Sequence, residues 1–260
     1  MFLSNLEIDY KSNKVNNWLT NPYKIHQRLW MGFEKQKDDI SKPDFLYRVE
    51  EDFRQAGELK PRILVLSNIS PLWDNAFSGE EFLKGKPQIL NLNLDNFIEE
   101  DRSFRFSLKA NPTKKIKNYR LLFREELEDF PELETRDTRA KYLEGKEKLA
   151  KLVETVSKEQ REKLPSKRIG IYKEHEQVEW LKRKGEQSGF EILNLQFDKG
   201  EKEKVSKKSD GKVVHTLDLL QVHFTGILRV NNVDDFKRAY SNGIGSGKAF
   251  GCGMLLLARV

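Results

Sequence analysis

Hydrophobic and polar residues alternate at the start of the chain, where Leu3, Leu6 and Ile8 stand among polar neighbours. A period of two is typical of a β-strand with one buried face, so a strand is predicted over 2–10. A helix is predicted to begin after Asn21 and to extend to residue 33, because Asn caps helices well and Pro22 suits the first turn. Further strands are predicted over 45–51, 62–68, 88–97 and 103–109. One helix between the first two of several strands favours an α/β sandwich of the ferredoxin or RNA-recognition type.

The composition changes after Pro112. Charged residues dominate 114–168, and a run rich in lysine and glutamate over 139–163 carries apolar residues at loosely helical spacing. This pattern predicts a solvated helix with a thin apolar stripe, lying in a linker or an insertion. The stripe consists of Ala140, Leu143, Leu149, Leu152, Val153 and Val156.

A second group of helix and strand patterns follows Arg168. The polar segment 198–212 has the composition of an exposed hairpin, and 213–230 is rich in strand-forming residues. The other predicted elements are strands over 169–172 and 190–197, helices over 174–188 and 233–241, and a last strand at the C-terminus. Two similar α+β units in tandem are therefore predicted, with residues 1–115 as the first domain, 116–165 as the charged linker or helical insertion, and 166–260 as the second domain.

Five glycines lie within the eleven residues 243–253. Such a stretch is no helix interior, because each glycine there costs about 1 kcal/mol relative to alanine. Exposed backbone N–H groups in a glycine-rich turn form a concave site for phosphate oxygens, and a lysine adds a mobile positive charge. We therefore expect Gly243, Gly245, Gly247 and Lys248 to bind an anion.

The spacing of residues in this stretch excludes two nucleotide-binding motifs. A Walker A loop needs glycine five positions before the Gly-Lys pair and Ser or Thr after it, and Asn242 and Ala249 stand there. A dinucleotide fingerprint needs a third glycine where Lys248 or Phe250 stands, and a helix where a short apolar run follows. A glycine-rich turn that only lets two elements pack closely remains the alternative.

Composition narrows the class of protein further. The 260 residues suffice for one large domain or two small ones, and a net charge of +6 is compatible with nucleic acid without establishing it. A single cysteine, Cys252, excludes an internal disulfide framework and a cysteine-based zinc site. The four histidines lack ligand spacing, so neither a metal nor another cofactor is expected. Without a signal-peptide pattern or an apolar run near 18 residues, a cytoplasmic protein with no membrane contact is expected.

Tyr23, His26 and Trp30 fall on one side of the first predicted helix, beside an apolar stripe of Ile25 and Leu29. A histidine at the border of a buried face is half sheltered, and its pKa can be tuned near neutrality. Residues of these types at such a border are most often packing residues, and that interpretation stays open beside a catalytic one.

RNA cleavage without a metal is one reaction that these residue types suit. It needs a base to take the ribose 2′-OH proton and an acid to protonate the departing 5′ oxygen. Histidine can act as either, and each role accelerates the reaction by about a hundred- to ten-thousand-fold. Tyr23 would orient the 2′-OH or the phosphate. The glycine stretch with Lys248 would stabilise the charge of the phosphorane.

Taken together, these segments resemble the CRISPR-associated repeat-processing endoribonucleases, most closely the CasE type of the type I-E Cascade complex. The matches run in order over nearly the whole chain, and the last of them is the most specific. The matching segments are FLS at 2–4, NPYKIHQRLW at 21–30, FLYRVE at 45–50, FRFSLKANP at 104–112, WL at 180–181, FTGIL at 224–228 and GIGSGKAFGCG at 243–253.

The resemblance implies an α+β fold of two tandem ferredoxin-like (RRM-like) domains. It implies metal-independent cleavage of the CRISPR repeat RNA at the base of its stem-loop, with a 2′,3′-cyclic phosphate and a 5′-hydroxyl as products, and continued binding of the crRNA within Cascade beside its other subunits. The family's active-site tyrosine and histidine fall on Tyr23 and His26. Lys167 and Arg168 match a basic pair before the second-domain helix, and the candidates for a basic RNA-gripping hairpin are Lys202, Lys204, Lys207 and Lys208.

Three functions therefore compete. The first is the endoribonuclease, the second is an RNA-hairpin-binding module of the same fold without catalysis, and the third is a nucleotide-using enzyme, which the failed motif spacings disfavour. An A-form stem is recognised mostly through its shape and phosphates, which suits a lysine-rich surface.

Overall fold

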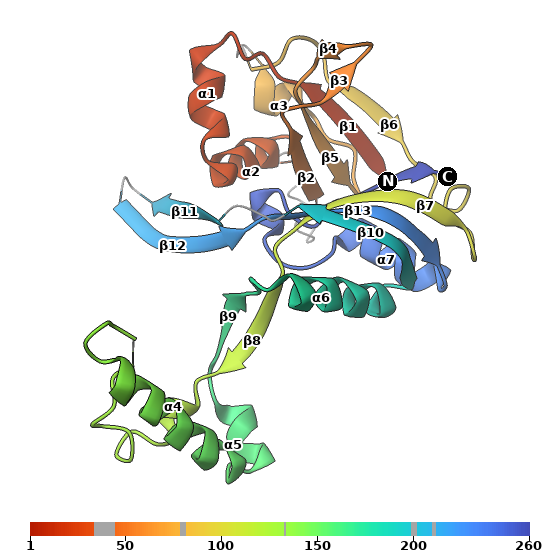
Figure 1. Cartoon of the computed structure of the whole chain (residues 1–260). Coiled ribbons are helices and arrows are strands. Elements are labelled where there is room, and N and C mark those ends of the chain that lie inside the picture. Colours follow the sequence, from red (N-terminus) through yellow and green to blue (C-terminus); the bar gives the residue numbers. More distant parts are fainter. Residues whose placement is uncertain (34–44, 79–81, 133, 199–201, 210–211) are drawn as a thin grey trace. The chain divides into compact units, whose positions relative to one another are not determined.

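The computed structural model describes residues 1–33, 45–78, 82–132, 134–198, 202–209 and 212–260 (Figure 1). The chain divides into two compact units. Unit 1 comprises Met1–Pro112 together with Gly170–Val260, and unit 2 comprises Thr113–Ile169.

The first half of unit 1 is a four-stranded sheet with helices on one face. Its strands lie in the order β2-β5-β1-β6, and each neighbouring pair is antiparallel. With its helices this is a βαββαβ fold in the strand order 2-3-1-4, the ferredoxin-like arrangement. The elements are β1 (Phe2–Glu7), α1 (Asn13–Leu19), α2 (Pro22–Met31), β2 (Phe45–Glu50), the short hairpin β3 (Arg54–Gln55) and β4 (Glu58–Leu59), β5 (Arg62–Ser67), α3 (Asp74–Phe77) and β6 (Gln88–Asn91).

The second sheet repeats this arrangement with the order β10-β13-β7-β14, again antiparallel throughout. Two tandem ferredoxin-like folds are thus present, as predicted. The hairpin of β11 and β12 stands between β10 and β13 in the sequence. The elements are β7 (Ser103–Ala110), α6 (Glu174–Gln187), β10 (Phe190–Asp198), β11 (Lys202–Ser209), β12 (Lys212–Leu220), β13 (Val222–Val230), α7 (Val233–Asn242), the 3₁₀ turn η3 (Lys248–Phe250) and β14 (Leu255–Arg259).

Strand β7 belongs to the second sheet, although the sequence analysis placed residues 103–109 in the first domain. It pairs with β13 and β14, and with no strand of the first sheet among the described residues. Unit 2 therefore interrupts the second ferredoxin-like fold between its first strand and its first helix, rather than linking the two folds.

Unit 2 contains β8 (Thr113–Lys117), the 3₁₀ turn η2 (Tyr119–Leu121), α4 (Arg139–Glu154), α5 (Lys158–Lys163) and all but the last residue of β9 (Ser166–Gly170), with β8 paired to β9. The single helix predicted over 139–163 is in fact two, because Ser157 begins a new one. Its side chain and that of Gln160 form a reciprocal capping box. Strand β9 also starts earlier than predicted and pairs with β8 rather than joining the sheet.

Alternate residues of β2 and β5 enter two different hydrophobic cores, as the period of two requires. Tyr47 and Val65 pack with α1, α2 and α3 in the first core. Leu46, Leu64 and Leu66 join the core of the second fold, which also contains Phe104, Phe224 and Phe236. The first sheet is therefore covered by helices on one face and contacts the second fold with the other.

Most other predicted elements were found with small shifts in their ends. The predicted strand over 88–97 ends at Asn91, because a turn follows in which Asn93 Oδ1 accepts from the Asp95 N–H at 3.0 Å. The strand-rich run 213–230 is two strands separated at Gln221. Helix α1 was missed, since seven residues are too few to show a helical period.

Candidate functional site

Helix α2 presents the candidate catalytic residues because its two ends and its buried face are well defined. Asn21 caps the helix, accepting the N–H of Tyr23 through Oδ1 at 3.0 Å, and Pro22 occupies the first turn. Ile25 and Leu29 are fully buried against the first sheet. Their burial leaves Tyr23 and His26 at the border of the buried face, as predicted.

His26 lies among aromatic rings and is half-buried. Its ring stacks on Phe45 with centroids 4.9 Å apart, and it lies 6.0 to 6.4 Å from the rings of Trp30, Tyr47 and Tyr23. Burial lowers the pKa of His26 below its usual 6.5. Its Nδ1 is buried and has no hydrogen-bond partner among the described residues. The imidazole is therefore neutral at pH 7 and suited to accept a proton.

The glycine-rich turn 243–253 needs its glycines for two separate reasons. All five adopt positive φ, a region that residues with a Cβ rarely enter. At Gly243 a Cβ would also approach Leu46 Cδ2 to 2.8 Å, and at Gly245 it would approach the Trp180 ring to 2.9 Å. Close packing, the alternative interpretation of this turn, therefore explains part of its composition.

Some backbone N–H groups of the turn already donate within the protein, so they are not available to an anion. The N–H groups of Gly243, Ile244 and Gly253 donate to Ala239, Gly253 and Lys109 carbonyls. Gly247 accepts from Phe250 and Cys252. Within the described chain, no such bond uses the N–H groups of residues 247–249 or the ammonium of Lys248. The donors that remain for an anion are therefore the N–H groups of Gly245 and of residues 247–249 and the ammonium of Lys248.

Helix α2 and the glycine-rich turn lie side by side, joined by a buried tyrosine that the sequence analysis did not single out. Tyr47 is completely buried, and its Oη lies 2.6 Å from the Pro22 carbonyl and 3.2 Å from the Ala249 carbonyl. Burial raises the pKa of Tyr47, so the phenol keeps its proton and donates. The rings of Tyr23 and Phe250 lie 6.3 Å apart. Helix α2, which carries His26, therefore lies against the turn that carries Lys248.

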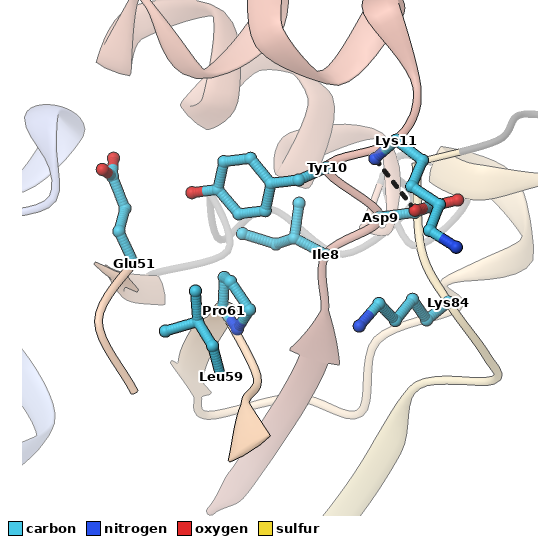
Figure 2. Close-up of a pocket in the computed structure, with 8 residues that line it drawn as sticks. All are labelled: Ile8, Asp9, Tyr10, Lys11, Glu51, Leu59, Pro61 and Lys84. Carbon is cyan, nitrogen blue, oxygen red and sulfur yellow. Dashed lines mark hydrogen bonds between the residues drawn. The ribbon is translucent and has the colours of Figure 1, made fainter. Parts of the chain in front are cut away.

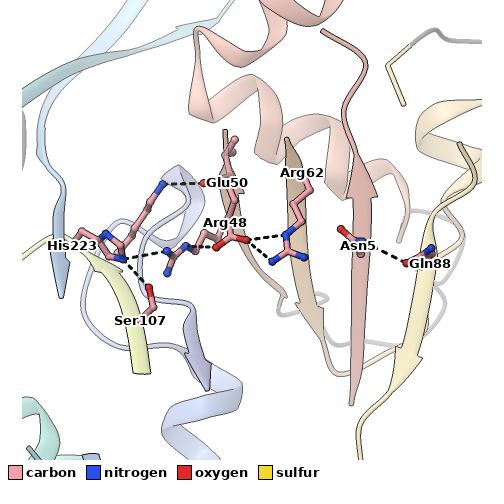
Figure 3. A network of polar contacts seen from close by, with 9 residues as sticks. Asn5, Arg48, Glu50, Arg62, Gln88, Ser107 and His223 are labelled. Atoms are coloured by element: carbon pink, nitrogen blue, oxygen red, sulfur yellow. Dashed lines mark hydrogen bonds and ion pairs between the residues drawn. The ribbon is translucent and has the colours of Figure 1, made fainter. Parts of the chain in front are cut away.

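A buried polar network links strand β2, which also carries Tyr47, to the second ferredoxin-like fold (Figure 3). Arg62 holds Glu50 through two nitrogens at 2.7 and 2.8 Å, and Arg48, with a side chain only 5% exposed, lies 3.4 Å from the same carboxylate. Arg48 also reaches across to His223 on β13, with Nη2 at 3.3 Å from Nε2. The described residues leave Nε and Nη1 of Arg48 without hydrogen bonds.

The contacts of His223 determine its protonation state. Its Nε2 accepts from Arg48, because a guanidinium N–H only donates, and Ser107 Oγ lies 2.7 Å from the same nitrogen. Burial lowers the pKa of His223, and the positive charges of Arg48 and Lys109 lower it further. His223 is therefore a neutral imidazole with its proton on Nδ1.

The predicted basic RNA-binding residues lie on two separate strands. Lys202, Lys204, Lys207 and Lys208 are on β11, which forms a hairpin with β12, and the backbone of β11 passes close to α2. Lys167 and Arg168 belong to unit 2, on β9, where both side chains are exposed.

Phe45, Tyr47, Arg48, Ser107, His223 and Phe250 complete the surroundings of the site and were missed as site residues. Apolar strand residues such as Phe45 and Tyr47 carry no sequence signal beyond that of an ordinary core. Their role follows only from the contacts that the fold makes between distant segments.

Two cavities are lined by residues of the glycine-rich turn, and another lies apart from it. The first, of about 350 Å³, is formed by Asn242, Gly243 and Gly245 together with residues of α6 and α7. The second, also of about 350 Å³, is lined by Phe45, Leu46, Ser241, Asn242 and Lys248. Another of about 420 Å³ lies at the end of β1 (Figure 2), and none of the candidate site residues lines it. Its lining consists of Ile8, Asp9, Tyr10, Lys11, Glu51, Leu59, Pro61 and Lys84.

Of the helices in the described ranges, none has the length and apolar character that crossing a bilayer requires.

Comparison with known proteins agrees with this fold. A curated relative, the CRISPR-associated endoribonuclease Cse3 of Thermus thermophilus, is 23% identical over 266 residues, which cover 99% of this chain and all of the relative. The structure of CRISPR endoribonuclease Cse3 bound to a 19-nucleotide RNA is similar with a TM-score of 0.67 at 22% identity, and both chains are covered completely. A chain of a CRISPR RNA-guided surveillance complex matches with a TM-score of 0.58 at 18% identity, again over the full length of both.

At these identities the solved structures establish the fold alone. The family is established by the model for CRISPR associated protein, which matches residues 1–259. The chain therefore belongs to the CRISPR-associated protein family.

Proposed function

We propose that this protein is a metal-independent endoribonuclease that cleaves CRISPR repeat RNA at the base of its stem-loop. The products are a mature crRNA with a 2′,3′-cyclic phosphate and a downstream RNA with a 5′-hydroxyl. The observation that carries the proposal is the connection of helix α2, with its neutral His26, to the lysine-bearing glycine turn through Tyr47. This arrangement brings a base and a cationic donor cluster to one place.

In the proposed reaction, His26 takes the proton of the 2′-OH. The 2′ oxygen attacks the adjacent phosphorus, and the bond from phosphorus to the 5′ oxygen breaks. The reaction neither gains nor loses a proton overall, because the 2′-OH releases one proton and the departing 5′ oxygen takes one up. A base with a pKa near or below the working pH suits this step, and burial lowers that of His26.

Charge builds up on the phosphorane oxygens as the reaction proceeds. Lys248 and the N–H groups beside it are among the donors that the turn leaves available, and they would stabilise that charge in a partly dehydrated site. Gly243 would contribute through its conformation, because its N–H already binds Ala239. Tyr23 lies one turn from His26 and would orient the reacting 2′-OH or phosphate.

The stem would be held by phosphate contacts. Strand β11 carries Lys202, Lys204, Lys207 and Lys208 and passes close to α2, so a duplex held there would lie near the catalytic helix. Lys167 and Arg168 are exposed and would add phosphate contacts. The protein would act in the cytoplasm and stay bound to its crRNA as a subunit of Cascade, beside the complex's other subunits.

A repeat-hairpin RNA incubated with the protein and excess chelator tests the proposal. Cleavage at one site is expected, and replacing the nucleotide just upstream of the cut by its 2′-deoxy form should stop cleavage and preserve binding. Cutting of the deoxy RNA would overturn the 2′-OH mechanism. Binding that leaves every RNA intact would instead favour a non-catalytic RNA-hairpin-binding module.

A further inference from the structure

The cavity of about 350 Å³ beside the glycine turn is built by both ferredoxin-like folds. Phe45 and Leu46 come from β2, Ser241 and Asn242 from the last turn of α7, and Lys248 from the start of η3. Its volume falls within the range of sites for small ligands, roughly 300 to 1,000 Å³. Of its lining residues, Lys248 alone has a place in the mechanism proposed above.

This cavity shares its walls with the catalytic site. Phe45 lines the cavity and stacks on His26 with ring centroids 4.9 Å apart. Lys248 lines it too and begins η3, whose last residue, Phe250, lies 6.3 Å from Tyr23 between ring centroids. A group held in the cavity would therefore lie next to a phosphate held between His26 and Lys248.

The lining offers the chemistry that one nucleotide requires. Lys248 makes no ion pair with any described residue and can meet a phosphate. Asn242 is exposed and carries both a donor and an acceptor, the combination that pairs with two positions of a base edge. Ser241 Oγ already donates to the Lys237 carbonyl, so it adds an acceptor only. Phe45 and Leu46 supply apolar walls.

We propose that this cavity is a nucleotide subsite, which holds the base of a nucleotide flanking the scissile phosphate and identifies it through the Asn242 amide. The proposal rests on the endoribonuclease function and adds to it a source of sequence preference. Cleavage-site choice would then depend on one unpaired or frayed base as well as on the shape of the stem. RNA bases outside a helix are recognised on their edges in this way.

Asn242 also lines the cavity formed with α6, but that cavity includes neither Phe45 nor Lys248, so it lacks the walls shared with the catalytic site. The cavity at the end of β1 does not compete for this role either. It is lined mainly by the end of β1 and by the β3–β4 region, with Tyr10, Lys11 and Lys84 around an apolar floor (Figure 2). No lining residue is shared with the site of His26 and Lys248, so a base held there would have no defined relation to the reacting phosphate.

Single-turnover cleavage of a hairpin panel tests the subsite. The panel carries each of the four bases at the nucleotide before the cut and, separately, at the nucleotide after it. Wild type, Asn242→Ala, Asn242→Asp and the control Asn96→Ala are compared; Asn96 is exposed in a turn and lines none of these cavities. Circular dichroism checks that each variant is folded.

Wild type is expected to prefer one base at one of the two positions by about tenfold or more, as a two-bond amide contact provides. Asn242→Ala should reduce that ratio to about twofold while still cleaving, and Asn242→Asp should move the preference toward a base with an amino group, such as cytosine. Equal cleavage of all four bases by wild type, or the same ratios in wild type and both Asn242 variants, would overturn the subsite. Wild type that cuts no hairpin would refute the endoribonuclease function instead.

Discussion

The hydroxyl of Tyr47 provides the sharpest test of how the site is assembled. It is buried completely and is the polar link between the first residue of α2 and the turn that carries Lys248, with distances of 2.6 Å to Pro22 O and 3.2 Å to Ala249 O. Tyr47→Phe removes the donor and keeps the ring. The carbonyls of the half-buried Pro22 and Ala249 then lose this donor, and a lost hydrogen bond of this kind costs about 0.5 to 1.5 kcal/mol.

Two measurements follow from that change. Urea unfolding should show a loss of stability of about 0.5 to 1.5 kcal/mol. Single-turnover cleavage, measured where wild type and variant are both folded, should slow by about ten- to a hundredfold, because a shift of about 1 Å between reacting groups has effects of that size. The Kd for the repeat hairpin should change by no more than about twofold, since most phosphate contacts lie elsewhere.

Tyr10→Phe is the matched control. Tyr10 lies in the same ferredoxin-like fold, and its buried hydroxyl has no hydrogen-bond partner among the described residues (Figure 2). Burial and the charges of Glu51 and Asp52 raise its pKa to about 12, so its phenol is likewise protonated. The control should leave stability and cleavage near wild type. A Tyr47→Phe variant that cleaves as fast as wild type, or a control that slows equally, would refute the positioning role.

Three further predictions concern the base, its pH dependence and the stem contacts. His26→Ala should slow single-turnover cleavage by at least a hundredfold and leave the Kd almost unchanged; comparable losses in both would indicate a packing role. Because burial lowers the pKa of His26 below 6.5, the neutral base predominates above that pH. The cleavage rate of wild type should therefore be level from about pH 6.5 upward and fall only as the pH drops through the lowered pKa, whereas a tenfold rise per pH unit between 7 and 8 would contradict a His26 base. Lys167→Ala and Arg168→Ala should each reduce the slope of log K against log salt by about 0.7 to 0.9, and Lys141→Ala, on the exposed face of α4, should leave it unchanged. An unchanged slope would remove the first two from the interface.

Local signals in the sequence were sufficient to predict helix α2 and its exposed border. The cap at Asn21 and the spacing of Ile25 and Leu29 act within a few residues of one another, so they are visible without any tertiary contact. A hairpin was likewise predicted within the polar segment 198–212, but only its first strand, β11, lies there, because its partner β12 comes from the strand-rich run that follows. What such patterns determine is the kind of element and the side it buries.

Partners of a strand are determined by distant segments, and here prediction from the sequence failed. Residues 103–110 alternate clearly and were predicted as a strand, yet nothing in them shows that they pair with β13 and β14 rather than with the first sheet. The insertion after Pro112 hides this further, because it separates β7 from the rest of its fold by 57 residues, Thr113–Ile169. Ser107 meets His223, the residue that contacts Arg48, only because of this pairing.

Strand β2 explains why the site needs both ferredoxin-like folds. Its side chains alternate between two faces, as in any strand. Phe45 and Tyr47 face the helices, where the first stacks on His26 and the second binds Pro22 and Ala249. Leu46 and Arg48 face the second fold, where they meet the glycine turn at Gly243 and the imidazole of His223. A displacement of β2 toward either fold would therefore move the base relative to Lys248, so the geometry of the reacting groups depends on how the two folds are joined and not on either fold alone.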